Sequence, residues 1–280
     1  MPADLHIHSN ASDGILSPSE IVKIAKKRGL SAISITDHDS VEGLDEAIAI
    51  SKKIGLNFVP GIELSAESEE WDLHILGYFI DHHSEELKKY LKNLQKRRKI
   101  RAKKIVNKLK KAGINIEYEQ VAIQSHGESI GRPHLARTMV KLGIVNSFQE
   151  AFNLYLRKEK PYYVKKYVIT PQEIIKILIK AKAIPVLAHP FSDNSINFIP
   201  SLAKIGLMGI EVYYPGYNKF EINELIRIAD RYELIKTGGT DFHGSETKIN
   251  YKINVKNIGD ITVDDNVVEI LAEKAKQLRK

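Results

Sequence analysis

Histidines and carboxylates recur in this sequence directly after short apolar runs or within them. His6 and His8 are two positions apart, a spacing that places both side chains on the same face of a strand. The nine candidate ligands are His6, His8, Asp13, His38, Glu63, His74, His189, Asp241 and His243. Imidazole suits first-row transition metals, whereas calcium and magnesium prefer sites made only of oxygen. The residue types therefore predict a transition-metal site.

The size of this set indicates how many ions it could hold. Nine ligands exceed the four of one tetrahedral site, so we expect two or three divalent ions. Histidines and carboxylates in this proportion fit Mn, Fe or Zn, with Mn favoured. Three such ions would carry more positive charge than the carboxylates neutralise. The surplus would stabilise a hydroxide and a phosphate dianion.

Glu63 is the most informative of the carboxylates because it follows the apolar run 58–62. A carboxylate in such a place is costly to bury unless it meets a cation. By contrast, His82, His83 and His126 lack a comparable position at a strand end. We expect these three to be ordinary surface or core histidines.

Short apolar runs alternate with helical patterns along most of the chain, which predicts an α/β protein with a parallel sheet or barrel. The expected strands are 3–7, 32–36, 57–63, 73–79, 184–188, 209–213 and 234–238. Nearly all the candidate ligands lie at the carboxyl ends of these strands, where parallel barrels carry their active sites. The link between the third and fourth strands is too short for a parallel crossover. We therefore expect an irregular barrel there and leave that pairing open.

Two segments carry the signals of a helix start. The Ser17 hydroxyl can accept a bond from the N–H three residues on, and Glu20 can return it, while Pro18 occupies the first helical position. The segment 170–173 repeats this pattern, so both sites predict the start of a helix.

The positive charge is confined to one segment. The net charge is +7, yet residues 88–111 hold thirteen Lys or Arg and no acidic residue. We expect a long basic helix over 84–112, within a chain divided into 1–96, a helical insertion at 97–166, and 167–280. This charge is typical of a solvated helical face or of a surface for an anionic partner. We keep both interpretations open, and the second predicts a role in binding longer substrates.

Other features exclude whole classes of protein. The chain has no cysteine, so disulfides and thiolate metal sites are impossible. The N-terminus does not resemble a signal peptide, and no stretch has the roughly 20 apolar residues that cross a bilayer. We expect a soluble cytoplasmic protein without a membrane partner, and no protein partner is predicted.

Several motifs, in this order and spacing, resemble the polymerase-and-histidinol-phosphatase (PHP) superfamily. They are DLHIHSNASDG, TDHD, GIELS, HILGY, AHP and TDFHG, within residues 1–80 and 167–245. The sequence GRPHL at 131–135 is similar to the branch with 3′,5′-nucleoside bisphosphate phosphatase and 5′-to-3′ exoribonuclease activity. The resemblance implies a distorted seven-stranded (β/α)7 barrel with a helical cap over the site.

The resemblance also implies roles for individual residues. One ion would be held by His6, His8, Glu63 and Asp241, a second by Glu63, His74 and His189, and a third by Asp13, His38 and His243. Arg132 and His134 would be catalytic and would bind the substrate phosphate. Asp37 and Asp39 would orient metal ligands.

The implied reaction is attack by a metal-bound hydroxide on a nucleotide phosphate ester or on the 5′ end of a short single-stranded RNA. Two alternatives stay open. One is a histidinol-phosphate-type phosphatase of the same superfamily. The other is a non-enzymatic nucleic-acid-binding protein whose metals are structural.

Overall fold

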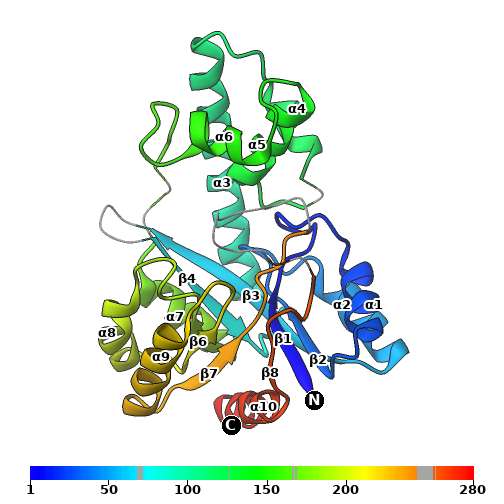
Figure 1. Ribbon diagram of the computed structural model, residues 1–280, viewed down its shortest axis with the longest axis vertical. Helices are drawn as coiled ribbons and strands as arrows, with labels where there is room; N and C mark the ends of the chain where they lie inside the picture. Colours follow the sequence, from blue (N-terminus) through cyan, green and yellow to red (C-terminus); the bar gives the residue numbers. More distant parts are fainter. Residues whose placement is uncertain (68–71, 126, 166, 168, 245–254, 256) are drawn as a thin grey trace.

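The candidate ligands lie on and beside a single sheet. The computed structural model describes residues 1–280 except 68–71, 126, 166, 168, 245–254 and 256. The described residues form eight strands in the order β7-β6-β5-β4-β3-β2-β1-β8 (Figure 1). These are β1 (Pro2–Ile7), β2 (Ala32–Ile35), β3 (Asn57–Glu67), β4 (Asp72–Tyr78), β5 (Ile184–Leu187), β6 (Gly209–Tyr213), β7 (Ile235–Gly238) and β8 (Val263–Asp264). The seven predicted strands are confirmed, but the predicted total is wrong by one. The extra strand, β8, has only two residues and is therefore too short to give an apolar pattern.

The sheet nearly closes on itself. Ile7 at the end of β1 forms a parallel bridge with Phe242, which follows β7. The His8 N–H donates to the Phe242 carbonyl at 2.9 Å, and the Asp241 N–H donates to the His6 carbonyl at 2.8 Å. These bonds bring candidate ligands from opposite ends of the chain side by side.

The pairing left open by the sequence is an antiparallel one. β3 and β4 pair antiparallel from Gly61 opposite Tyr78 to Glu67 opposite Asp72, and β4 also pairs antiparallel with β5. An antiparallel pair needs only a short connection, which explains the brief link between them. Because β4 runs in reverse, His74 near its start lies at the same end of the sheet as the end of β3.

Helices pack around the sheet through their apolar faces. They are α1 (Pro18–Lys27), α2 (Leu44–Ile54), α7 (Pro171–Lys180), α8 (Ile199–Lys204), α9 (Lys219–Arg231) and α10 (Asn266–Arg279), with a 3-10 turn η2 (Ile196–Phe198). Both predicted helix starts are confirmed, since Ser17 and Thr170 each form a capping box three residues ahead of a glutamate. None of the helices in the described ranges is both long enough and apolar enough to cross a membrane.

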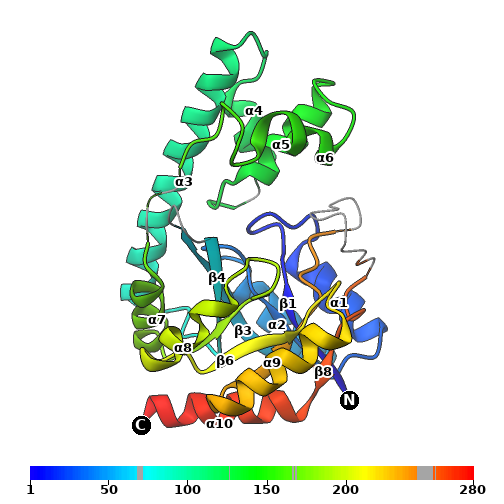
Figure 2. The same ribbon diagram turned by 60° about the vertical axis from the view of Figure 1, so that its left-hand side comes forward.

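A helical cap stands over the ligand-bearing end of the sheet. The predicted long basic helix is confirmed as α3 (Glu85–Lys111), which rises from the sheet and joins it to the cap (Figure 2). The other cap elements are α4 (Tyr118–Ile123), α5 (Arg132–Lys141), α6 (Phe148–Ala151) and the π-helical η1 (Phe152–Leu156). The cap has its own apolar cluster, which includes Leu109 and Met139. The boundaries at 97 and 166 stay a prediction, and residue 166 lies outside the described residues.

Several basic side chains of α3 have partners inside the protein. Arg98 Nε lies 2.5 Å from Asp39 Oδ2, and Arg101 Nε donates to the Val164 carbonyl at 2.7 Å. Lys108 donates to two further carbonyls of the segment 161–163. Arg98 thus attaches α3 to the barrel, and Arg101 and Lys108 bind the segment 161–164 of the cap to α3. A role in binding longer substrates therefore depends on the exposed lysines of α3, such as Lys104.

We predict that Leu109→Ala loosens the cap more than the barrel. Leu109 is fully buried in the cap cluster, and a Leu-to-Ala cavity costs about 2–5 kcal/mol. Hydrogen exchange should rise mainly in the cap helices. The matched control is Leu142→Ala, the same substitution at a cap residue that is 39% exposed. Equal loss of protection in barrel and cap would contradict a cap with its own core.

Candidate active site

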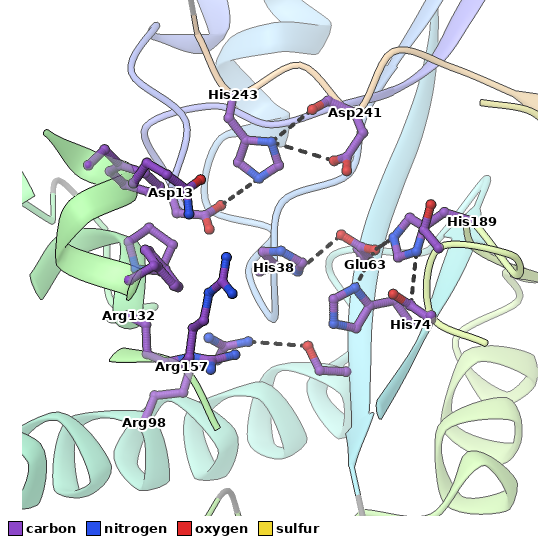
Figure 3. Close-up of a pocket in the computed structure, with 18 of the residues that line it drawn as sticks. Asp13, His38, Glu63, His74, Arg98, Arg132, Arg157, His189, Asp241 and His243 are labelled. Atoms are coloured by element: carbon purple, nitrogen blue, oxygen red, sulfur yellow. Dashed lines mark hydrogen bonds and ion pairs between the residues drawn. The ribbon is translucent and has the colours of Figure 1, made fainter. Parts of the chain in front are cut away.

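The nine candidate ligands converge at the end of the sheet beneath the cap, and Figure 3 shows all of them except His6 and His8. His6, Glu63 and His74 lie on strands β1, β3 and β4. The others lie in the segments that follow β1, β2, β5 and β7: His8, Asp13, His38, His189, Asp241 and His243. The structure thus brings together every residue that the sequence predicts as a metal ligand.

Glu63 occupies the centre of the group. Glu63 is fully buried, and both of its carboxylate oxygens face histidine nitrogens. Oε1 lies 3.0 Å from a nitrogen of His74 and 3.2 Å from one of His189. Oε2 lies within 3.0–3.5 Å of nitrogens of His6, His8 and His38. A carboxylate so placed can bridge neighbouring ions.

The ligand atoms form groups small enough to share an ion. The groups are His6, His8, Glu63 and Asp241; His8, Asp13, His38 and His243; His38, Glu63 and His74; and His74, His189 and Asp193. The first equals the implied set, and the second adds His8 to the implied set of Asp13, His38 and His243. The implied set of Glu63, His74 and His189 is divided: Glu63 and His74 group with His38, and His74 and His189 group with Asp193, which was not among the predicted ligands.

The site fits a divalent metal by the chemistry of its donor atoms. Several buried side-chain atoms make no hydrogen bond in the described part of the chain, although some lie at ion-pair distance from one another: His8 Nδ1, His38 Nδ1, His74 Nδ1, Glu63 Oε2 and Asp241 Oδ1. Buried polar atoms without partners are rare and call for an explanation. A cation that accepts lone pairs from nitrogen and oxygen would satisfy all of them.

Charges in the cluster shift the pKa values of its members. Burial raises the pKa of Glu63, but His38 and His74 outweigh it, so the pKa falls well below the usual value. Burial lowers the pKa of His6, but Glu211 and Asp241 outweigh it and raise that pKa well above the usual value. Burial also dominates at His38, whose pKa is lowered. The buried carboxylates thus stay ionised where positive charge is close.

Two further carboxylates position the candidate ligands. Glu211, fully buried on β6, accepts from His6 Nδ1 at 3.0 Å and from the His189 N–H at 2.8 Å. Asp193 Oδ2 lies 2.9 Å from His189 Nδ1. Carboxylates that hold the second nitrogen of a metal-binding histidine fix the ring orientation. An acidic residue inside an apolar strand could have identified Glu211 from the sequence, whereas Asp193 gives no such signal.

The backbone at this site includes conformations that favour glycine. His189 has φ 28° and Asp241 has φ 50°. Such conformations cost on the order of 1–3 kcal/mol and persist when surrounding bonds fix them. Here the N–H groups of both residues are fixed by hydrogen bonds, to Glu211 and to the His6 carbonyl.

Asp37 and Asp39 do not have the roles expected for them. Asp37 accepts from the Ser9 N–H, from its hydroxyl and from the Ser12 hydroxyl, so it fixes the loop that leads to Asp13. Asp39 pairs with Arg98 and anchors α3. Both carboxylates therefore hold the segments around the site rather than the ligands themselves.

Of the histidines expected to be ordinary, two have a carboxylate neighbour. His82 Nε2 lies 2.9 Å and His83 Nε2 3.5 Å from Asp45 Oδ1, in a group apart from the nine residues and more exposed than they are. His126 lies outside the described residues.

A cavity of about 270 Å³ separates the ligand cluster from the cap. Among its lining residues are the cap side chains Arg98, Arg101, Arg132, Arg157, Phe148 and Phe152. Figure 3 shows Arg98, Arg132 and Arg157 on the side of the cavity opposite Glu63, His74 and His189. The cavity thus combines a wall of candidate metal ligands with a cationic one, which suits an anionic ligand.

The two predicted cap residues differ in their positions. Arg132 lines the cavity, and its Nη1 donates to the Leu156 carbonyl at 3.2 Å. His134 is 1% exposed and has backbone partners at both ring nitrogens: the Gly131 N–H at 3.0 Å and the Ser12 carbonyl at 2.9 Å. Burial lowers its pKa to about 4. The structure therefore places His134 where it ties α5 to the loop before Asp13, not at the cavity wall.

Comparison with known proteins settles the family, since the PHP domain matches residues 4–179. The chain belongs to the PHP domain family. This PHP protein is 34% identical to a 5′-3′ exoribonuclease of Haemophilus influenzae, over 86% of this chain and 89% of that one. It is 32% identical to a 3′,5′-nucleoside bisphosphate phosphatase of Chromobacterium violaceum, over 86% of each chain.

The fold comparison agrees with the family. A crystal structure from Bifidobacterium adolescentis, described as a metal-dependent phosphoesterase, superposes with a TM-score of 0.88 and 29% identity, over 97% of this chain and 96% of that one. The predicted PHP fold is thereby confirmed.

We predict that Glu63→Gln removes bound metal from this PHP protein more completely than His38→Ala. The amide keeps the size of the carboxylate but loses the charge that faces five histidines. Metal content and turnover should be measured on the same samples. Full metal content and turnover in Glu63→Gln would contradict a bridging role.

Glu211→Gln should weaken metal binding about 10–100-fold, the usual effect of removing a carboxylate that orients a ligand. Titration with Mn²⁺ provides the measurement. Glu273→Gln, the same change at an exposed residue of α10, is the control. Equal affinity in the two variants would show that Glu211 does not orient His6 and His189.

Proposed function

We propose that this protein is a metal-dependent phosphoesterase that hydrolyses a phosphate ester of a nucleotide, such as a 3′,5′-nucleoside bisphosphate, or the 5′ end of a short RNA. The observation that carries the proposal is the cavity between the nine-residue cluster and the arginine side chains of the cap. A phosphate ester needs both cationic partners and an activated water molecule, and this cavity supplies positions for both.

The cluster would hold two or three divalent ions, with Mn favoured over Fe or Zn. Mixed imidazole and carboxylate donors support a first-row transition metal. Such ions, when bound, lower the pKa of a water molecule and neutralise charge on phosphate oxygens. The ligands proposed for them are His6, His8, Asp13, His38, Glu63, His74, His189, Asp241 and His243.

The chain's own residues would orient the ester. Arg132 can present its planar group to phosphate oxygens while its bond to the Leu156 carbonyl fixes its position. Phe148 and Phe152 line the same cavity and give an apolar surface for a base or sugar. His134 would act as a positioning residue, because it ties α5 to the segment that carries Asp13.

The size of the cavity favours a small ligand or the end of a chain. Its volume of about 270 Å³ is slightly below the usual range of ligand pockets, roughly 300 to 1,000 Å³. The names of the two relatives, an exoribonuclease and a nucleoside bisphosphate phosphatase, agree with a terminal or single nucleotide.

The decisive experiment measures phosphate release from a substrate panel with added Mn²⁺. The panel contains adenosine 3′,5′-bisphosphate, 5′-phosphorylated RNA and histidinol phosphate. We expect hydrolysis of the first two and loss of activity with a chelator. Preference for histidinol phosphate would support the other phosphatase. A metal-loaded protein that cleaves none of them while it binds RNA would favour the nucleic-acid-binding alternative.

We predict that Arg132→Ala keeps bound metal but lowers kcat/KM about 10²–10³-fold, the usual cost of removing one positioned donor to developing charge. Arg132→Lys should recover only part, because lysine lacks the planar pair of donors. Unchanged turnover in Arg132→Ala would show that this side chain does not reach the phosphate.

A further inference from the structure

Among the described residues that line the cavity, one cationic side chain has no partner within the protein. Arg98 is paired with Asp39, Arg101 donates to the Val164 carbonyl, and Arg132 donates to the Leu156 carbonyl. The Arg157 guanidinium also lines the cavity but has no hydrogen-bond or ion-pair partner among the residues that the structure describes. A guanidinium group has five N–H donors in a fixed plane, and Arg157 is exposed, so these donors can exchange water for a ligand.

The backbone that carries Arg157 is fixed on both sides. Its N–H donates to the Phe152 carbonyl at 3.2 Å, and its carbonyl accepts from the Lys160 N–H at 3.1 Å. Leu156, just before it, is buried and accepts the bond from Arg132. The position of Arg157 is therefore set by the cap fold, and only its side chain is free to move.

Resting on the proposed function, we propose that Arg157 binds the second, non-reacting phosphate of a nucleoside bisphosphate. The reacting phosphate must lie at the metal-binding cluster, within reach of Glu63 and His74. Figure 3 shows Arg157 on the other side of the cavity from these two residues, beside Arg132. A substrate with phosphates on two sides of one ribose would place its second dianion at that wall.

Arginine suits this task chemically. Its planar group can bind two phosphate oxygens at once, and its charge is fixed at all working pH values. In the absence of the second phosphate, Arg157 would have nothing to bind. It would then select the doubly phosphorylated substrate without contributing to cleavage of a monophosphate.

The test compares Arg157→Gln with wild-type protein on three substrates: adenosine 3′,5′-bisphosphate, adenosine 3′-monophosphate and adenosine 5′-monophosphate. We expect kcat/KM for the bisphosphate to fall roughly 10- to 100-fold, the usual range for a hydrogen-bonded charged group. The value for whichever monophosphate is cleaved should fall far less than the value for the bisphosphate. Arg157→Lys should recover part of the loss.

Lys158→Gln is the matched control. Lys158 is the next residue, it is exposed, it carries the same charge and it does not line the cavity. This variant should behave as wild type on all three substrates. A fall of the same size in Lys158→Gln and Arg157→Gln would overturn the proposal, because it would reflect general attraction by positive charge.

Two other outcomes would also overturn it. An equal loss of kcat/KM on bisphosphate and monophosphate would place Arg157 at the reacting phosphate. No loss on either would show that the side chain does not meet the substrate.

A binding measurement separates this inference from the proposed function. Calorimetric titration of metal-free protein with adenosine 3′,5′-bisphosphate needs no turnover. Weaker binding by Arg157→Gln than by Lys158→Gln supports the subsite even if the protein cleaves none of the esters, an outcome that would end the proposed function alone. Equal binding by the two variants overturns the subsite while hydrolysis by wild type keeps the function.

Discussion

The buried carboxylate of Glu63 is the group on which the rest of the site depends. An ionised carboxylate without water is stable only beside hydrogen-bond donors or a cation. Five histidines face its two oxygens at 3.0–3.5 Å. To assemble them, the chain must bring together β1, β3, β4 and the segments after β2 and β5. The near closure of the sheet between Ile7 and Phe242 adds Asp241 and His243 to the same place.

The position of the cap depends on contacts with the segments that carry the candidate ligands. Arg98 of α3 reaches Asp39, which follows β2, and Asp39 gives its N–H to the Glu63 carbonyl at 2.9 Å. One short chain of contacts thus links the cap to the strand that carries the central ligand. His134 makes a second link, to the Ser12 carbonyl. Because of these two links, the cap arginines Arg98, Arg132 and Arg157 are held opposite the ligand cluster.

The sequence was sufficient for the parts of the fold and site that follow regular patterns. Seven strands and the helix starts at Ser17 and Thr170 follow from apolar periodicity and capping chemistry. The convergence of the nine residues follows from their common place at strand ends. The antiparallel pairing of β4 could not be derived, because apolar alternation does not distinguish strand directions. His74 still reached the site, since β4 enters the sheet from the end where β3 leaves it.

Contacts that join distant segments could not be read from the sequence. Asp193 is four residues after His189 in a loop, and only the folded loop turns it toward that ring. The partners of Arg98 and Arg101 likewise come from other elements, so a run of like charges gave no indication that these side chains have internal roles. Arg157 follows a π-helical turn that no local signal predicts.

Anomalous diffraction from crystals grown with Mn²⁺ tests the central claim most directly. We expect two or three ions between β1, β3 and the segments after β5 and β7, each with several of the nine residues as ligands and Glu63 shared by at least two ions. The contradicting result would be an empty cluster in protein that still hydrolyses a nucleotide ester, or ions bound only beside Asp45, His82 and His83.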